Sequence, residues 1–92
     1  MQEHKSVQAR VQGRVQGVSF RAWTRLEAQV RELSGWVKNE EDGSVTALLA
    51  GREAAVDEML KELRHGPPAA VVRDLQIEAA GWPESEGFHI LR

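Results

Sequence analysis

A loop bracketed by two glycines constrains the fold of this chain more than any other feature of its sequence. Residues 13–21 read GRVQGVSFR and lie between an alternating apolar segment and a helical apolar pattern. A glycine-rich connection from a strand to a helix can turn several backbone N–H groups toward one point, where the helix N-terminus adds partial positive charge. Arg21 adds a planar guanidinium suited to phosphate oxygens. The segment therefore predicts a local anion site.

This loop does not match the common nucleotide-binding patterns. Only three residues separate Gly13 from Gly17, and Val18 stands where an ATP-binding loop has its lysine. The spacing also differs from the glycine pattern of dinucleotide-binding folds. From the two glycines alone, a tight connection without any ligand stays an open interpretation.

The composition limits the possible functions. The chain has 92 residues, with 12 Lys and Arg against 14 Asp and Glu, and a formal net charge of -2. This length predicts one small domain over residues 1–92, and the charge balance argues against a nucleic acid partner. The sequence has no cysteine, which excludes disulfides and thiolate metal sites and suits the cytoplasm. No segment is apolar over the length of a membrane span, so we expect no membrane association.

Alternation of apolar and polar side chains predicts five strands. The pair Asp42 and Gly43 predicts a hairpin turn between the second and third of them. The fifth strand is short and follows a polar loop. The predicted strands span residues 6–12, 35–40, 44–50, 70–78 and 88–91.

Two segments have apolar residues at helical spacing. In the first, Trp23, Leu26, Val30 and Leu33 recur at intervals of three and four, which predicts about four turns with these side chains in the core. The second spans residues 53–65 and is followed by a glycine and two prolines, which is typical of a helix end.

The order of these elements predicts an α+β fold of the ferredoxin-like type, βαββαβ with a short C-terminal strand added. Both helices are expected on one face of an antiparallel sheet. Right-handed crossovers give the strand order 4-1-3-2 and leave the position of the fifth strand open. The same topology occurs in RNA-binding and regulatory domains, so the fold does not assign a function.

The three tryptophans are expected to serve packing. Trp23 and Trp36 lie in apolar patterns and are predicted to be in the core. Trp82 precedes a proline in a polar loop, where we expect it to anchor the loop.

Asn39 is the polar residue best placed to face the glycine loop. It lies near the end of the predicted strand that contains Trp36, although asparagine has poor strand propensity. Asn39 is therefore either an early turn former or a polar group placed for function, and the residue type does not decide between them.

Taken together, these segments resemble the acylphosphatase family. The resemblance covers nearly the whole chain and depends on GRVQGVSFR, GWVKNEEDGSV and HGPPAAVV occurring in this order. It implies the ferredoxin-like fold and hydrolysis of the carboxyl–phosphate bond of acyl phosphates to a carboxylate and inorganic phosphate, with no metal and no cofactor. It also implies a small-molecule acyl phosphate as substrate, binding of inorganic phosphate or other anions at the loop, and a monomer.

The resemblance also implies roles for single residues. Arg21 and Asn39 are the implied catalytic residues, with Arg21 anchoring the phosphoryl group and Asn39 positioning the attacking water. Backbone amides of the loop complete the implied phosphate site. Its residues are Gln16, Gly17, Val18, Ser19, Phe20 and Arg21.

Two features depart from the family pattern or complicate it. Many members end the first helix with Leu-Gly-Leu, where this chain has Arg31, Glu32 and Leu33. Glu32 is then expected in a left-handed position that favours glycine. The acidic run 40–42 follows Asn39 and would repel an anion, so we expect its side chains to point into solvent.

A non-catalytic acylphosphatase-like module that only binds phosphate ligands is the main alternative, and the residues alone do not exclude it. RNA recognition is disfavoured, because the two central strands carry no aromatic residues.

Overall fold

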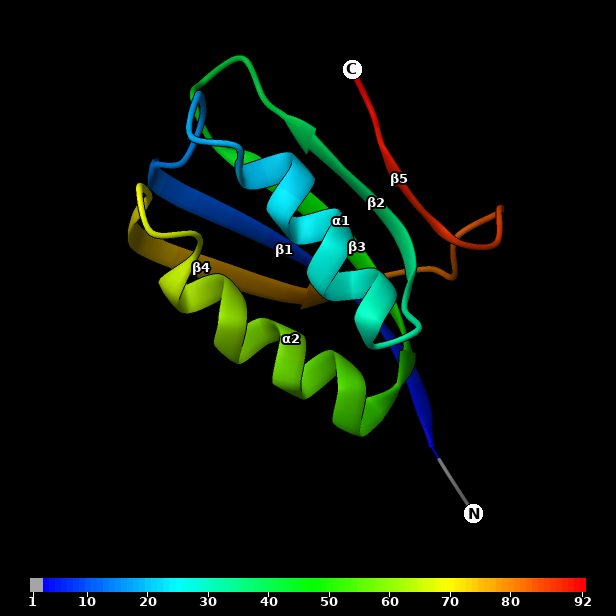
Figure 1. Ribbon diagram of the computed structural model, residues 1–92. Coiled ribbons are helices and arrows are strands. Elements are labelled where there is room, and N and C mark those ends of the chain that lie inside the picture. Colours follow the sequence, from blue (N-terminus) through cyan, green and yellow to red (C-terminus); the bar gives the residue numbers. More distant parts are fainter. Residues whose placement is uncertain (1–2) are drawn as a thin grey trace.

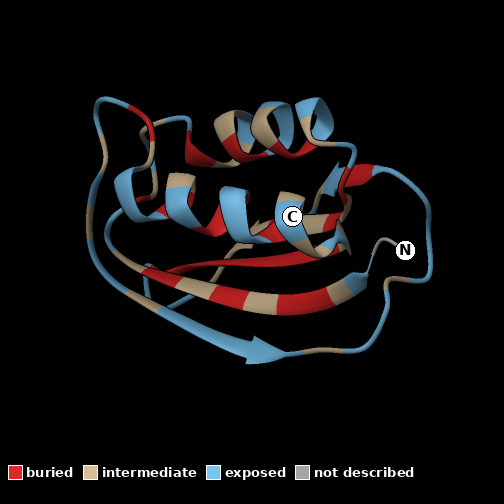
Figure 2. Cartoon of the chain, turned by 90° about the horizontal axis from the view of Figure 1, so that it is seen from below, coloured by how far each residue is buried: buried red, intermediate tan, exposed pale blue. Residues whose placement is uncertain are grey.

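The computed structural model describes residues 3–92 as a five-stranded sheet with two helices on one of its faces (Figures 1 and 2). The predicted ferredoxin-like arrangement is confirmed. No helix within residues 3–92 is long and apolar enough to cross a membrane. The elements are β1 His4–Arg14, α1 Phe20–Val30, β2 Ser34–Asn39, β3 Val45–Arg52, α2 Glu53–His65, β4 Val71–Ala79 and β5 Phe88–Ile90.

The sheet has the strand order β4-β1-β3-β2-β5. The first four strands pair antiparallel in the predicted order. The position of β5, which the sequence left open, is at the edge of the sheet beside β2, and the two strands are parallel. Val37 pairs with Ile90, and the Leu91 N–H donates to the Val37 carbonyl at 2.8 Å. The sheet is therefore mixed, and the residues after β5 lie beside the end of β2.

Gly13 serves the sheet rather than the loop. The register between β1 and β4 shifts between Gln12 and Gly13, and Gly13 has φ 132°. A Cβ atom at this position would lie 2.1 Å from the carbonyl oxygen of Val71, so the two strands approach closely only because a glycine stands here. Of the two glycines that bracket the predicted loop, Gly17 alone lies outside the strand.

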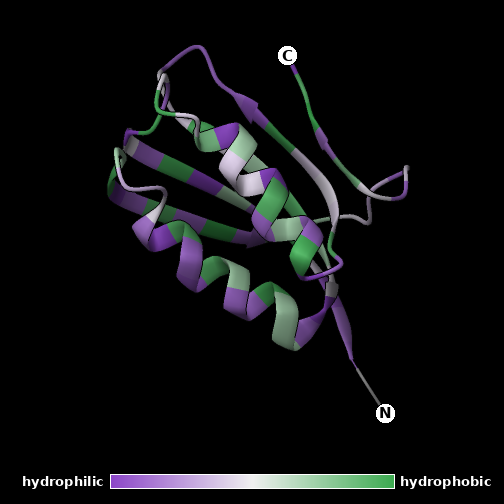
Figure 3. Cartoon of the chain, in the orientation of Figure 1, coloured by the Kyte–Doolittle hydropathy of each residue, from purple (hydrophilic) through white to green (hydrophobic). Residues whose placement is uncertain are grey.

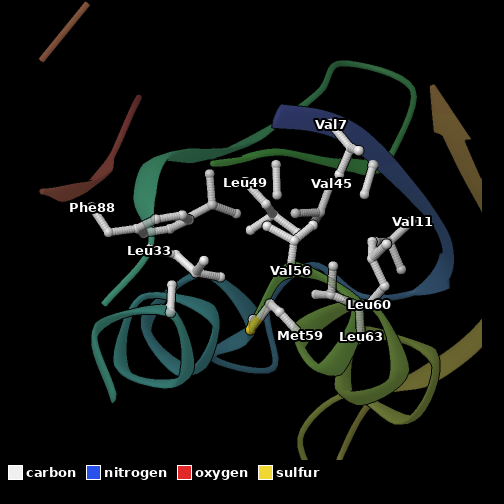
Figure 4. Packing of buried hydrophobic residues seen from close by; sticks show 14 of the residues in the cluster. Val7, Val11, Leu33, Val45, Leu49, Val56, Met59, Leu60, Leu63 and Phe88 are labelled. Carbon is white, nitrogen blue, oxygen red and sulfur yellow. The ribbon is translucent and has the colours of Figure 1, made fainter. Parts of the chain in front are cut away.

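The core lies between the helices and the inner face of the sheet (Figures 2 and 4). Apolar side chains from the sheet interdigitate with those of α2, whose opposite face is hydrophilic (Figure 3). The fully buried members include Val11, Val37, Val45, Leu49, Val56, Met59 and Leu63.

Helix α1 packs on the sheet through a different face from the one predicted. Its buried residues are Phe20, Thr24 and Ala28, at intervals of four, whereas Leu26 and Val30 are 59% and 78% exposed. Phe20, Thr24 and Ala28 lie on one side of the helix and face the sheet, so Leu26 and Val30, at other angles around the helix, face outward. The prediction that Leu26 and Val30 belong to the core is therefore wrong.

Helix α1 is about one turn shorter than predicted, and it ends in the expected left-handed form. The helix ends at Val30, and Glu32 has φ 56°. The Glu32 N–H donates to the Gln29 carbonyl at 3.0 Å and the Leu33 N–H to the Ala28 carbonyl at 2.9 Å. These are the two bonds of a Schellman motif, with glutamate in the glycine position.

The tryptophans are less buried than predicted. Trp23 is half-buried and meets Phe20 edge to face, with ring centroids 5.4 Å apart. Trp36 points to the sheet face away from the helices, since its neighbours Gly35 and Val37 are the buried residues, and the Lys38 ammonium lies 5.4 Å from its ring centroid. The core assignment of Trp36 is wrong.

The loop tryptophan, Trp82, is also more open than expected. Its side chain is 57% exposed, and its ring contacts His4 edge-on with centroids 6.5 Å apart. It therefore touches the start of β1 without becoming a buried anchor.

Candidate functional site

The loop between β1 and α1 leads into the helix, and its backbone amides are unpaired in the described structure. Ser19 caps α1 in the left-handed conformation, with φ 62° and ψ 24°, and its side chain makes no capping hydrogen bond. The first turn carries no acidic residue. Within residues 3–92, no carbonyl accepts a hydrogen bond from the N–H groups of residues 16–19. A helix start without internal partners and with partial positive charge is suited to an anion.

A pocket of about 330 Å³ lies where the start of α1 meets the ends of β2 and β5. It brings Arg21 and Asn39 together, although they come from different elements. Of the predicted phosphate-binding residues, Gln16 and Val18 do not line the pocket. The lining residues are Val15, Gly17, Ser19, Phe20, Arg21, Ala22, Asn39, Ile90 and Arg92.

A larger hollow of about 440 Å³ lies beside Trp36 and Trp82, between β2, β5 and the loop that precedes β5. Its lining contains Glu84 and His89 but no lysine or arginine. Volume alone therefore does not identify the anion site, and the charge of the lining favours the smaller pocket.

The guanidinium of Arg21 has no acidic partner in the described part of the chain. Its Nη1 donates to the Leu91 carbonyl at 3.3 Å. This bond ties the side chain to the segment after β5 and leaves its other donors without a described protein acceptor. An arginine held by a single carbonyl in this way is available to bind an anionic ligand through several N–H groups.

Asn39 belongs to the strand rather than to the turn. It is the last residue of β2 and pairs with Val45. The turn itself is closed by residues 40–44, where the Glu40 N–H donates to the Ser44 carbonyl at 2.8 Å. Asp42 accepts from the Ser44 N–H at 3.0 Å. The interpretation of Asn39 as an early turn former is therefore wrong, and its side chain lines the pocket instead.

The acidic residues after Asn39 are largely neutralised or solvated. Asp42 forms an ion pair with Arg10, and the Glu40 carboxylate lies 3.9 Å from the Lys38 ammonium. Glu41 is exposed at the hairpin tip. The expected outward orientation therefore holds for Glu41 and Asp42, while Glu40 is half-buried beside a cation.

Arg92 is a second cation in the pocket lining that the sequence did not indicate. Val37 of β2 pairs with Ile90 of β5. Asn39 lies two residues after Val37, and Arg92 lies two residues after Ile90, so the two residues are at the same level of the parallel pair. Only the parallel pairing of β5 with β2 brings the two positions together. Across residues 3–92, no group of three or more His, Cys, Asp or Glu side chains is placed to hold a metal ion.

The fold and the site define a class of small α+β domain that has a pocket lined by arginines at a strand-to-helix loop. The sequence profile of the acylphosphatase family matches residues 7–90. An acylphosphatase from Mesorhizobium japonicum is 58% identical over 88 residues, which cover 95% of this chain and 94% of that protein. One from Sinorhizobium medicae is 50% identical over 91 residues, covering 98% and 97%.

A solved structure gives the same result. The crystal structure of acylphosphatase from Bacillus subtilis superposes with a TM-score of 0.90 at 35% sequence identity, covering 98% of this chain and 100% of that one. The chain belongs to the acylphosphatase family. Because relatives named for the activity match nearly from end to end, the prediction of a hydrolase is confirmed and the catalytic function is favoured over a non-catalytic module.

Proposed function

We propose that the pocket at the start of α1 is the active site at which this enzyme hydrolyses acyl phosphates without a metal ion. The observation that carries the proposal is that one pocket gathers Arg21, Asn39 and the unpaired loop around Gly17. Each supplies a different part of phosphoryl transfer, namely charge neutralisation, orientation of water and a cradle of amides.

The phosphoryl group binds at the start of α1. Its equatorial oxygens accept hydrogen bonds from the loop amides and from the guanidinium of Arg21. These donors are fixed before the substrate arrives, so they stabilise the negative charge on the transferring group with little reorganisation. The positive end of the α1 dipole acts in the same direction.

Asn39 orients the attacking water from the end of β2. The water oxygen attacks phosphorus, the bond from phosphorus to the acyl oxygen breaks, and the bonding electrons leave with the carboxylate. The proton of the water passes to a phosphoryl oxygen of the substrate, which yields inorganic phosphate. Because a carboxylate is a good leaving group, a neutral amide that positions water is sufficient and no strong general base is needed.

The same proposal covers the assembly and the location of the enzyme. Residues 1–92 act as one acylphosphatase-like domain, and the chain works as a monomer, since this one chain supplies Arg21, Asn39 and the loop around Gly17 to the same pocket without needing a second copy. The lack of cysteine suits the reducing cytoplasm. With a net charge of -2, the chain has no overall positive field to attract nucleic acid.

Release of inorganic phosphate from benzoyl phosphate in the presence of a chelator tests the proposal. The wild type is expected to be fast. Arg21→Ala is expected to lose both turnover and inhibition by inorganic phosphate, whereas Asn39→Ala loses turnover by about a hundredfold or more and is still inhibited by phosphate. Arg25→Ala, one turn further along α1 on its exposed side, is the matched control and retains activity.

Two outcomes contradict the proposal. Hydrolysis by the wild type no faster than in buffer favours a phosphate-binding module. Equal loss of phosphate inhibition in folded Asn39→Ala and Arg21→Ala shows that Asn39 binds the phosphoryl group and does not position water.

A further inference from the structure

The side chain of Gln16 connects the two halves of the site. Gln16 directly precedes Gly17, and its amide nitrogen Nε2 donates to the Glu40 carbonyl at 2.8 Å and to the Ser44 carbonyl at 2.9 Å. Both donor hydrogens of the amide are thereby used. The side chain is half-buried and does not line the pocket, so its contacts are with the hairpin and not with a ligand.

The two carbonyls lie at the point where the hairpin begins. The Ser44 carbonyl also accepts from the Glu40 N–H at 2.8 Å, which closes the turn. The amide of Gln16 therefore donates to the residue after β2 and to the residue before β3 at the same time. Asn39 directly precedes Glu40, which accepts one of these hydrogen bonds, and Gly17 directly follows Gln16 in the loop.

No other hydrogen bond joins the loop 15–19 to the segment 40–44 in the described part of the chain. Arg10 also holds this hairpin, through Ser44 Oγ at 3.3 Å and an ion pair with Asp42. It approaches from the middle of β1 and fixes the turn to the sheet. The direct hydrogen bonds between the turn and the phosphate-binding loop in the described residues are those of Gln16.

We propose that the side-chain amide of Gln16 is a positioning group that sets the separation between the phosphate-binding loop and Asn39. This inference rests on the proposed active site. Water positioned by Asn39 must attack in line with a phosphoryl group held by the loop, so the two parts require a fixed spacing. A shift of about 1 Å between reacting groups can reduce the rate of a reaction by about a hundredfold.

Gln16→Met tests the inference, because it keeps the length of the side chain and removes both donors. The expected result with benzoyl phosphate is a fall in kcat of about tenfold to a hundredfold, with KM and inhibition by inorganic phosphate changed less than about threefold. Gln76→Met, at an exposed position of β4, is the matched control and keeps full activity. If Gln16→Met does not fold, Gln16→Leu takes its place, since it also removes both donors without adding a charge.

A double-mutant cycle separates positioning from general support of the fold. If Gln16 acts through Asn39, adding Gln16→Met to Asn39→Ala lowers kcat by less than about twofold more. Full additivity of the two losses overturns the inference, and so does a kcat for the single variant within about twofold of the wild type. An inactive wild type contradicts the proposed function instead, so the two failures are distinguishable.

Discussion

The two ends of α1 differ in how their backbone groups are satisfied, and the end whose groups lack partners is the one at the proposed active site. Ser19 and Glu32 are the two residues other than glycine with positive φ in the described chain, at 62° and 56°. At the Glu32 end, backbone hydrogen bonds close a Schellman motif. At the Ser19 end, no side-chain cap and no acidic residue meet the helix start.

The arginines at the two ends show the same contrast. Arg31 donates to Glu27 and to Glu58, both at 2.9 Å. Burial opposes its charge, but the two carboxylates more than offset this, so the pKa of Arg31 is raised above its ordinary value. A cation at this end also matches the helix dipole. Arg21 stands at the opposite end, where the dipole disfavours a cation, and no described acid balances it.

Backbone strain and an unbalanced charge therefore indicate a ligand site only where neighbouring protein groups do not compensate them. At Glu32 the backbone hydrogen bonds of the helix end compensate the strain of the left-handed conformation, so this strain does not indicate a ligand site. At Ser19 no described protein group compensates the strain or balances the charge of Arg21, and in the proposed active site an anionic ligand balances that charge.

The largest expected effect comes from Arg21→Lys, which keeps the charge and removes the planar fork of donors. We expect kcat/KM to fall by at least about a hundredfold, together with weaker inhibition by phosphate, because one preorganised donor is worth about that much. Steady-state kinetics with benzoyl phosphate measures both, with Arg25→Lys as the control. Near-normal kinetics for Arg21→Lys would remove the guanidinium from the site.

A smaller effect is expected at Ser19, where the backbone and not the hydroxyl is proposed to act. Ser19→Gly keeps the left-handed conformation and is expected to retain activity within about threefold. Ser19→Val introduces a β-branched side chain that tolerates this conformation poorly, so it is expected to lose about tenfold in kcat/KM and about 1 to 2 kcal/mol in unfolding free energy. Urea denaturation and kinetics on both variants provide the comparison. Loss of activity in folded Ser19→Gly contradicts a purely backbone role.

The smallest effect is expected at the other end of the helix. Glu32→Gly removes the left-handed strain at the cost of a more flexible unfolded chain, for an expected net stabilisation of about 0.5 to 1 kcal/mol. Activity is expected to stay within about twofold, because Glu32 is remote from the pocket lining. Urea denaturation measures the change in unfolding free energy, and steady-state kinetics measures the activity. If Glu32→Gly is less stable than the wild type, the Glu32 side chain stabilises the fold by more than its left-handed backbone conformation destabilises it.

Features that depend on local spacing could be predicted from the sequence. The second helix was predicted over 53–65 and is observed over those residues, since an apolar stripe and a glycine followed by prolines define both its face and its end. The Asp42-Gly43 turn and the left-handed Glu32 also follow from local chemistry.

Features that depend on the assembled sheet could not be predicted. The pairing of β5 with β2, and with it the position of Arg92, is decided by which edge of the sheet is free. The exposure of Leu26 follows from which side of α1 faces the sheet, and that is decided by the packing of Phe20, Thr24 and Ala28. The bonds of Gln16 join segments that are distant in sequence, so no local pattern reveals them.

The parallel docking of β5 has a consequence for how the active site is completed during synthesis. Arg21 and Asn39 are made early, but Ile90 and Arg92, which line the same pocket, are made after every other element of the fold. Closure of the pocket requires a contact between β2 and β5 across a long stretch of chain, and such contacts form slowly. A nascent chain that has grown only to the loop before β5 therefore holds Arg21 and Asn39, the two proposed catalytic residues, in a pocket that still lacks the residues of β5 and the segment after it.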